Sequence, residues 1–352
     1  MSIEKRSNDP PRPANRRNVC AGAFLAVAAC IVLGALATSG VSAKEYTKET
    51  IILYWPWKMD VGMTAISSAK ADGAFAKDGI DLQLNLGVPE AEMISRVTST
   101  PNVIGMTTAS EFLRARAGGA PIVAFAAGAL ENSAVFYVSP DSKIRGPSDF
   151  AGRSVGYQVG EETAALYEIM MNRSRLSRST IKEIPIAQDT QPFSQREIDV
   201  WPGYVGRTSL QLLSASLPFR TIKPADFGAH LLGTVYFTSE STLQRHPDAL
   251  RRFLGVLIDG WEATFGNYDQ SLARLMQSQT PALNRATAEL LLDEQRQLVR
   301  PLGERVAEFG QARWTDTQNQ LLQFRMLKKS VDLTGAVTYE LLKDVYRRRM
   351  AR

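Results

Sequence analysis

Aromatic and charged residues gather in two segments that could bind a small planar molecule. The first is Trp55-Pro56-Trp57-Lys58-Met59-Asp60, directly after a short β-rich run, and the second is Trp201-Pro202-Gly203-Tyr204. Indole and phenol rings offer flat, rigid faces for stacking, whereas Pro and Gly are poor strand residues. We therefore read both segments as loops or turns whose Trp55, Trp57, Asp60, Trp201 and Tyr204 contact a ligand. The alternative is that these rings are buried in a hydrophobic core.

Polar side chains stand where two helices are expected to begin. Thr107, Thr108 and Ser110 precede one helix, and Glu161 precedes another. The free backbone N–H groups of a helix start bind anions, and hydroxyl groups there can donate hydrogen bonds to a ligand. Simple N-capping is the alternative for Ser110. The acidic Glu161 and Glu162 would repel a sulfonate or nitrate, so the pattern favours a ligand with amino or ring N–H donors.

Motifs for catalysis and metal binding are missing from the sequence. It contains no G-x-S-x-G, no G-x-G-x-x-G at a strand-to-helix turn and no P-loop. The two histidines, His230 and His246, have no companions at metal-ligand spacing. We therefore expect a binding protein without metal or cofactor rather than an enzyme.

The first 43 residues have the layout of a secretory signal peptide. A basic segment is followed by an almost wholly apolar run at 19–37 and then by Val41-Ser42-Ala43, with small residues at both recognition positions. Cleavage after Ala43 would release a periplasmic protein and remove both cysteines, Cys20 and Cys30. A retained membrane anchor, a lipoprotein at Cys30 and twin-arginine export through Arg16-Arg17 are the alternatives.

Net charge argues against nucleic-acid binding. The whole chain has 41 Lys and Arg against 36 Asp and Glu, but five of the basic and two of the acidic residues precede residue 44. The exported chain would therefore carry 36 basic and 34 acidic residues. Such a small excess does not favour binding to a phosphate backbone.

Strand-like and helix-like segments alternate through the first two thirds of the chain. Residues 80–86 show strict period-two alternation, and short apolar runs at 50–54, 103–106 and 121–126 are separated by helical patterns. This order predicts an α/β protein with a largely parallel sheet. From His246-Pro247 onward the pattern is helical.

Several segments, in this order and spacing, resemble one known family. They are Asp72-Gly73-Ala74-Phe75-Ala76-Lys77-Asp78-Gly79-Ile80-Asp81, Glu111-Phe112-Leu113-Arg114-Ala115-Arg116-Ala117-Gly118-Gly119-Ala120-Pro121, residues 149–156, and Arg245-His246-Pro247-Asp248. Residues 51–346 resemble the solute-binding proteins of ABC importers that take up nitrate, taurine or alkanesulfonates, and the pyrimidine precursors of thiamine.

The resemblance implies a type II-like periplasmic-binding-protein fold of two α/β lobes joined by two crossover strands, with a helical C-terminal region. Lobe I would comprise 44–133 and 236–352, and lobe II 134–235, with crossings near 130–138 and 232–237. Asp226 begins a segment similar to the family's "DYG", where it could accept from a ring amine or cap a turn. The lobes would close around the ligand.

The expected partners are a small-molecule ligand and an ABC permease at the membrane, and we expect a monomer. An aromatic ring from each lobe would sandwich a planar heterocycle such as a thiamine-type pyrimidine precursor. Sulfonate or taurine, nitrate, or another aromatic compound are the alternatives. Pyrimidine synthases share the implied fold, but their cysteine-rich motif is missing here, which disfavours an enzyme of that kind.

Overall fold

The computed structural model describes residues 47–186, 190–278 and 283–351. The predicted signal peptide, its cleavage site and the anchor, lipoprotein and twin-arginine alternatives lie outside the described residues. Within those three ranges, no helix is both long enough and apolar enough to cross a membrane.

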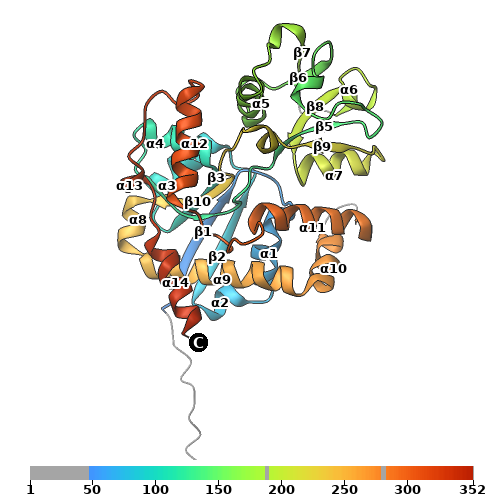
Figure 1. Cartoon of the computed structure of the whole chain (residues 1–352). Helices are drawn as coiled ribbons and strands as arrows, with labels where there is room; N and C mark the ends of the chain where they lie inside the picture. Colours follow the sequence, from blue (N-terminus) through green and yellow to red (C-terminus); the bar gives the residue numbers. More distant parts are fainter. Residues whose placement is uncertain (1–46, 187–189, 279–282, 352) are drawn as a thin grey trace, which may run out of the picture. The chain divides into compact units, whose positions relative to one another are not determined.

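The first lobe is built on a five-stranded sheet with the order β2-β1-β3-β10-β4 (Figure 1). β1 pairs in parallel with β2 and β3, whereas β10 is antiparallel to both β3 and β4. Its strands are β1 (Glu49–Trp55), β2 (Ile80–Leu86), β3 (Val103–Thr108), β4 (Ile122–Ala127) and β10 (Thr234–Ser239).

The second lobe repeats this plan with the order β7-β6-β8-β5-β9. β6 is parallel to β7 and β8, and β5 is antiparallel to β8 and β9. Its strands are β5 (Ala134–Val138), β6 (Ser154–Tyr157), β7 (Lys182–Pro185), β8 (Val200–Tyr204) and β9 (Arg220–Ile222). The α/β prediction is confirmed. Each sheet is mixed because its one antiparallel strand, β10 or β5, is the strand that arrives directly from the other lobe.

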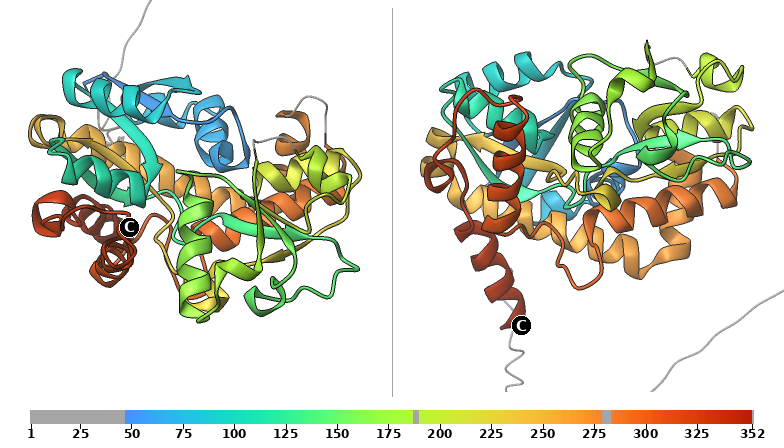
Figure 2. Two further views of the ribbon diagram at one scale, coloured as in Figure 1. Left: turned by 90° about the horizontal axis from the view of Figure 1, so that it is seen from above. Right: turned by 45° about the horizontal axis from the view of Figure 1, so that its top comes forward.

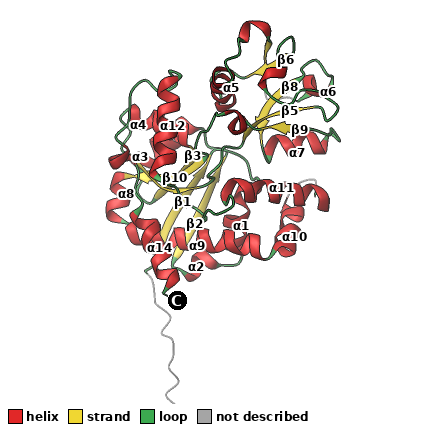
Figure 3. Ribbon diagram, in the orientation of Figure 1, coloured by secondary structure: helices red, strands yellow, loops and turns green. Residues whose placement is uncertain are grey.

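Helices flank both sheets, and the chain after β10 is helical as predicted (Figure 3). Before β10 lie α1 (Thr64–Ala71), α2 (Ala74–Lys77), α3 (Glu90–Ser99), α4 (Ala109–Ala117), α5 (Glu162–Arg173), α6 (Gln191–Ser194) and α7 (Arg207–Ser214). After it come α8 (Glu240–Arg245), α9 (Pro247–Gly266), α10 (Tyr268–Ser278), α11 (Arg285–Val299), α12 (Gln311–Gln323), α13 (Leu333–Ala336) and α14 (Glu340–Met350). Short 3-10 turns are η1 (Val61–Met63), η2 (Pro147–Asp149), η3 (Arg178–Thr180) and η4 (Pro224–Phe227).

Helix α9 shows how the sequence positions the C-terminal helices. Its apolar residues recur at helical spacing, and Phe253, Leu257 and Trp261 are buried. Phe253 stacks on Phe75 of α2 with 5.8 Å between ring centroids. The same helix packs against α1, α10 and α14, so it ties the C-terminal region to the first lobe.

Two chain segments connect the lobes, one between β4 and β5 and the other between η4 and β10 (Figure 2). They lie against each other, because the N–H groups of Gly128 and Ala129 both donate to the carbonyl of Thr234, at 2.8 and 3.2 Å. A Cβ atom on Gly233 would lie only 2.4 Å from the carbonyl oxygen of Glu131. Glycine is therefore required where the two segments meet.

The prediction of a turn at residues 201–204 is wrong, because these residues form most of β8. Pro202 has no N–H to donate, which normally excludes proline from an inner strand. Here β8 pairs with β6 at Val200 alone, and Gly156 of β6 leaves room for the proline ring. On its other edge β8 pairs fully with β5, which holds Trp201 opposite Tyr137.

Candidate ligand-binding site

The loops that follow the strands of the two lobes meet each other. Gly206, after β8 of the second lobe, lies so near Val61 of the first that a Cβ atom would stand 3.1 Å from its side chain. Ser110 at the start of α4 donates a 2.7 Å hydrogen bond to Glu162 at the start of α5. Ligands of open α/β sheets bind beyond the carboxyl ends of the strands. This junction between the lobes is therefore the candidate site.

The tryptophan loop after β1 forms one wall of the junction. Trp55 is the last residue of β1 and only 2% exposed, and the ring of the partly buried Trp57 meets it edge-on at 5.7 Å. The carbonyl groups of Trp55 and Trp57 accept from the N–H groups of Val88 and Gly87, which follow β2. The indole N–H of Trp55 is buried without a hydrogen-bond partner among the described residues, so it is a donor that a bound molecule could meet.

Asp60 caps the 3-10 turn η1 with its carboxylate, which accepts from the N–H of Gly62 at 2.9 Å. Burial raises the pKa of Asp60 from 3.8 to about 6, against the lowering effects of the Gly62 N–H and of Arg207 in the second lobe. Its charge also contributes to the raised pKa of Tyr236 in β10. Asp60 is thus a partly neutralised acid that faces a cation of the other lobe.

The hydroxyl residues at the end of β3 divide into two roles. Thr107 is buried and donates to the carboxylate of Glu90 at 2.7 Å. Thr108 is the N-cap of α4, where its hydroxyl accepts from the N–H of Glu111 at 3.2 Å. Burial raises the pKa of Glu90, and the nearby charges of Glu111 and Glu161 raise it further. Thr108 therefore carries the capping role that was the alternative for Ser110.

Glu162 is the most deeply buried acid of the junction. It begins α5, and burial raises its pKa to about 7 although the hydroxyl of Ser110 and the amide of Asn132 lower it. Ser110 itself is completely buried. Sequence reasoning noted both acids and selected Glu161 as the ligand contact, because two adjacent acids at a helix start give no sign of which one turns inward.

Tyr204 and Glu161 line the second lobe's side of the junction. The hydroxyl of Tyr204 donates to Glu161 at 3.2 Å, and the guanidinium of Arg207 lies over the tyrosine ring, 4.8 Å from its centroid. Burial and the charges of Glu162 and Glu161 raise the pKa of Tyr204. Arg207 therefore covers one face of the Tyr204 ring, and Glu161 accepts from its hydroxyl.

Two predicted residues lie apart from this group. The ring of Trp201 packs near Phe193, with 6.5 Å between centroids, in a hydrophobic cluster made only of second-lobe residues. Asp226 is exposed in η4, and no hydrogen bond or ion pair within the described ranges joins it to the junction. The sandwich of Trp55 or Trp57 with Trp201 is therefore not assembled in this structure.

The junction is acidic overall, since carboxylates from both lobes converge there. Asp60 and Glu90 come from the first lobe, and Glu161 and Glu162 come from the second. The charge of Arg207 lowers the pKa of Asp60, and the charge of Arg114 in α4 lowers those of Glu90 and Glu162. Among the residues described, no group of three or more His, Cys, Asp or Glu side chains is placed to hold a metal ion. Glu90 escaped sequence reasoning because an acid that opens a helix has an ordinary structural role there. Arg207 escaped it because nothing in the neighbouring sequence marks this arginine as part of a site.

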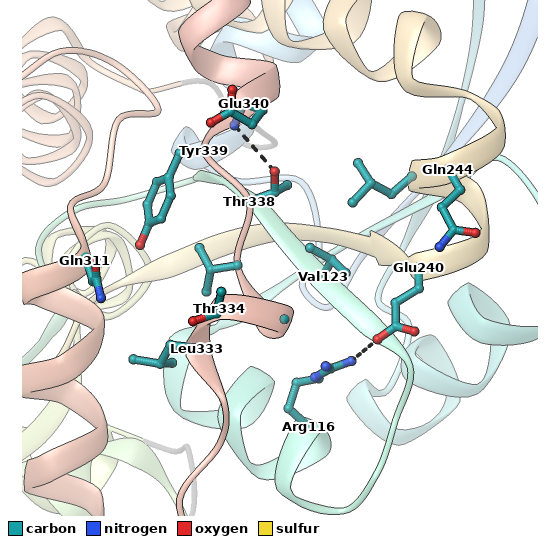
Figure 4. Close-up of a pocket in the computed structure, with 13 residues that line it drawn as sticks. Arg116, Val123, Glu240, Gln244, Gln311, Leu333, Thr334, Thr338, Tyr339 and Glu340 are labelled. Carbon is teal, nitrogen blue, oxygen red and sulfur yellow. Dashed lines mark hydrogen bonds and ion pairs between the residues drawn. The ribbon is translucent and has the colours of Figure 1, made fainter.

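A separate pocket of about 570 Å³ lies on the surface of the first lobe. Figure 4 shows Val123 of β4 beneath it, with the Arg116–Glu240 ion pair on one side and Tyr339 on the other. The residues that line it come from α4, α8, the start of α12 and the segment around α13. None of the residues predicted to bind the ligand is among them.

Known proteins share this architecture. The periplasmic aliphatic sulphonate binding protein SsuA from Escherichia coli is 18% identical, with a TM-score of 0.64 over 83% of this chain and 92% of that one. The periplasmic sulfonate-binding protein SsuA from Methylobacillus flagellatus is 10% identical, with a TM-score of 0.67 over 87% and 96%. The desulfurization enzyme DSZB is 15% identical, with a TM-score of 0.62 over 86% and 100%. At these identities the likeness shows the fold alone.

Sequence comparison identifies the family. No curated protein matches the chain significantly in sequence. The family model described as NMT1/THI5 like matches residues 61–271, which is more than half of the chain and includes Glu90, Glu162 and Arg207 of the junction but not its tryptophan loop or Asp60. The chain therefore belongs to the NMT1/THI5-like family and has the two-lobed fold of periplasmic binding proteins.

Proposed function

We propose that the chain is the extracytoplasmic solute-binding subunit of an ABC importer and captures a planar, amine-bearing heterocycle, such as a thiamine-type pyrimidine precursor, between its lobes. The observation that carries this proposal is the convergence of carboxylates from both lobes beside Tyr204. An amino or protonated ring group matches such a site in charge and hydrogen bonding. The family and the sulfonate-binding neighbours support the importer role.

Thermal shift measurements on residues 44–352 test the ligand class. An aminopyrimidine of the thiamine type should raise the melting temperature, because a ligand present at 100 times its Kd adds about 2.7 kcal/mol. Glu161→Gln and Asp60→Asn should reduce the shift. Glu168→Gln is the matched control, since Glu168 lies on the same helix but bonds Tyr157 and Arg178 within its own lobe. If none of the amines raises the melting temperature, this choice of ligand is wrong.

A sulfonate is the second candidate, because two structurally similar proteins are described as sulfonate-binding and Arg207 offers a cation at the junction. Taurine and an alkanesulfonate therefore belong in the same measurement. A shift with these compounds that is lost in Arg207→Ala, but kept in Glu161→Gln, would favour the sulfonate over the amine.

We propose binding rather than catalysis, although an enzyme shares the fold. The cysteines of this sequence are confined to Cys20 and Cys30, ahead of the proposed cleavage site. Export is tested by the mass of the protein recovered from the periplasm. An N-terminus at Lys44 agrees with the proposal, and a chain that keeps residues 19–37 at the membrane would contradict it.

A further inference from the structure

The lobes are joined by a hydrogen bond that leaves no room for a ligand between its partners. Ser110 of the first lobe and Glu162 of the second are 52 residues apart in sequence, yet their side-chain oxygens lie 2.7 Å apart and both residues are buried. Because both side chains are buried in this contact, separation of the lobes must expose them to solvent. The sequence analysis expected Ser110 to contact the ligand, but this geometry gives its hydroxyl to the other lobe.

In a second contact of the same kind, the second lobe supplies the hydroxyl and helix α11 supplies the carboxylate. Glu294 of α11 accepts from the hydroxyl of Ser209 at 3.2 Å and from the N–H of Gly206 at 3.3 Å, both at the start of α7 in the second lobe. Helix α11 packs on α10, which packs on α9 of the first lobe. The Ser209 oxygen also lies 2.9 Å from the hydroxyl of Tyr137 in β5, which fixes it to the second sheet.

We propose that the Ser110–Glu162 and Ser209–Glu294 hydrogen bonds form a two-point latch that draws the lobes together before any ligand binds. This inference rests on the proposed function only in assuming that the lobes close around a ligand. In each contact a hydroxyl of one lobe satisfies a largely buried carboxylate of the other, which would otherwise lose its solvation without compensation. Ser110 and Glu162 are then positioning residues that set affinity through the fraction of closed protein.

The latch is tested by measuring the separation of the lobes in the ligand-free protein. Residues 44–352 contain no cysteine, so Gln83→Cys on β2 and Lys182→Cys on β7, both exposed, accept one spin label each. Electron–electron double resonance then gives the distribution of distances between the lobes. The readout needs no ligand, so a failed ligand screen and a failed latch are separate results.

Removal of both hydroxyls in Ser110→Ala/Ser209→Ala should shift the distribution to longer, broader distances. Each lost contact should reduce the ratio of closed to open protein about tenfold, the effect of leaving a buried acceptor unpaired. Ser67→Ala is the matched control, because that hydroxyl donates to Thr64 within its own helix. Glu162→Gln should retain the short distances, since its amide oxygen can still accept from Ser110.

A double variant whose distances superimpose on those of the unmodified chain would overturn the latch. A shift of equal size in Ser67→Ala would overturn it too, because the effect would then not depend on contacts between the lobes. If the double variant does not fold, the single variants Ser110→Ala and Ser209→Ala are compared instead, each with half of the expected change in free energy.

Discussion

Substitution of Gly233 by alanine should destabilise the protein at the point where the two connecting segments meet. The new Cβ atom would lie 2.4 Å from the carbonyl oxygen of Glu131 and 2.6 Å from that of Ala129. Both obstacles are backbone atoms, so no side chain can rotate away to make room. The carbonyl of Gly233 also accepts from the N–H of Ala109 at 2.8 Å, so a shift of the segment would disturb the start of α4 as well.

The magnitude follows from the known cost of inserting a methyl group into a packed site. Overpacking usually costs about 1–3 kcal/mol, and we expect Gly233→Ala near the upper end because two carbonyl groups must move together. In urea the midpoint should fall while the slope stays constant, since the surface exposed on unfolding is nearly the same. Unfolding of residues 44–352 in urea is monitored by circular dichroism and by tryptophan fluorescence.

The control is Gly255→Ala in the middle of α9. A Cβ atom there meets nothing within 4 Å, and alanine is favoured over glycine inside a helix by up to about 1 kcal/mol. The control should therefore leave stability unchanged or increase it. A Gly233→Ala protein as stable as the unmodified chain would refute the reasoning, since the connecting segments would then have freedom to separate.

Three further substitutions compare a buried acid, a largely buried arginine and an exposed ion pair. The raised pKa of Asp60 means that the folded chain holds this proton more tightly than the unfolded chain, so stability is lost as pH rises from about 4 through about 6. Across that range, the free energy of unfolding of Asp60→Asn should exceed that of the unmodified chain by an amount that grows to about 3 kcal/mol. A difference in the free energy of unfolding that stays constant with pH would contradict the raised pKa. Arg252→Ala should cost about 2–4 kcal/mol, because this largely buried guanidinium donates to the carbonyl of Asp78 at 2.7 Å and pairs with Glu49. Arg274→Ala, which breaks an exposed pair with Asp72, should cost under about 1 kcal/mol in the same assay, and equal losses would show that burial does not distinguish the two.

The main features of the fold could be predicted from local patterns. Period-two alternation at 80–86 matches β2, and the helical spacing of apolar residues after His246 matches α9 and its successors. These patterns succeed because a strand or an amphipathic helix must bury one face whatever it packs against. The crossing back to the first lobe near 232–237 was implied by the family resemblance and not by a local pattern; β10 begins at Thr234.

The composition of the site could be predicted less well, because side-chain partners there are distant in sequence. Local reasoning singled out the tryptophan loop, Asp60 and Tyr204, since a strand ending in aromatic and charged residues is visible locally, and their contact with a ligand stays a prediction. It placed Trp201 in a turn, but β5 pairs along the whole of β8 and makes Trp201 a strand residue of the second core. It could not identify Glu294, which is 85 residues from its partner Ser209.

The sequence alone determined the alternation of strands and helices, the aromatic loop after β1 and the absence of cysteine after residue 30, because each of these is a property of neighbouring residues. Only the tertiary structure decided that Ser110 pairs with Glu162, that Arg207 covers Tyr204 and that four carboxylates share one junction. The physical reason is that hydrogen bonds and pKa values depend on burial and on charges brought together by the two crossings, and neither quantity is encoded in local spacing.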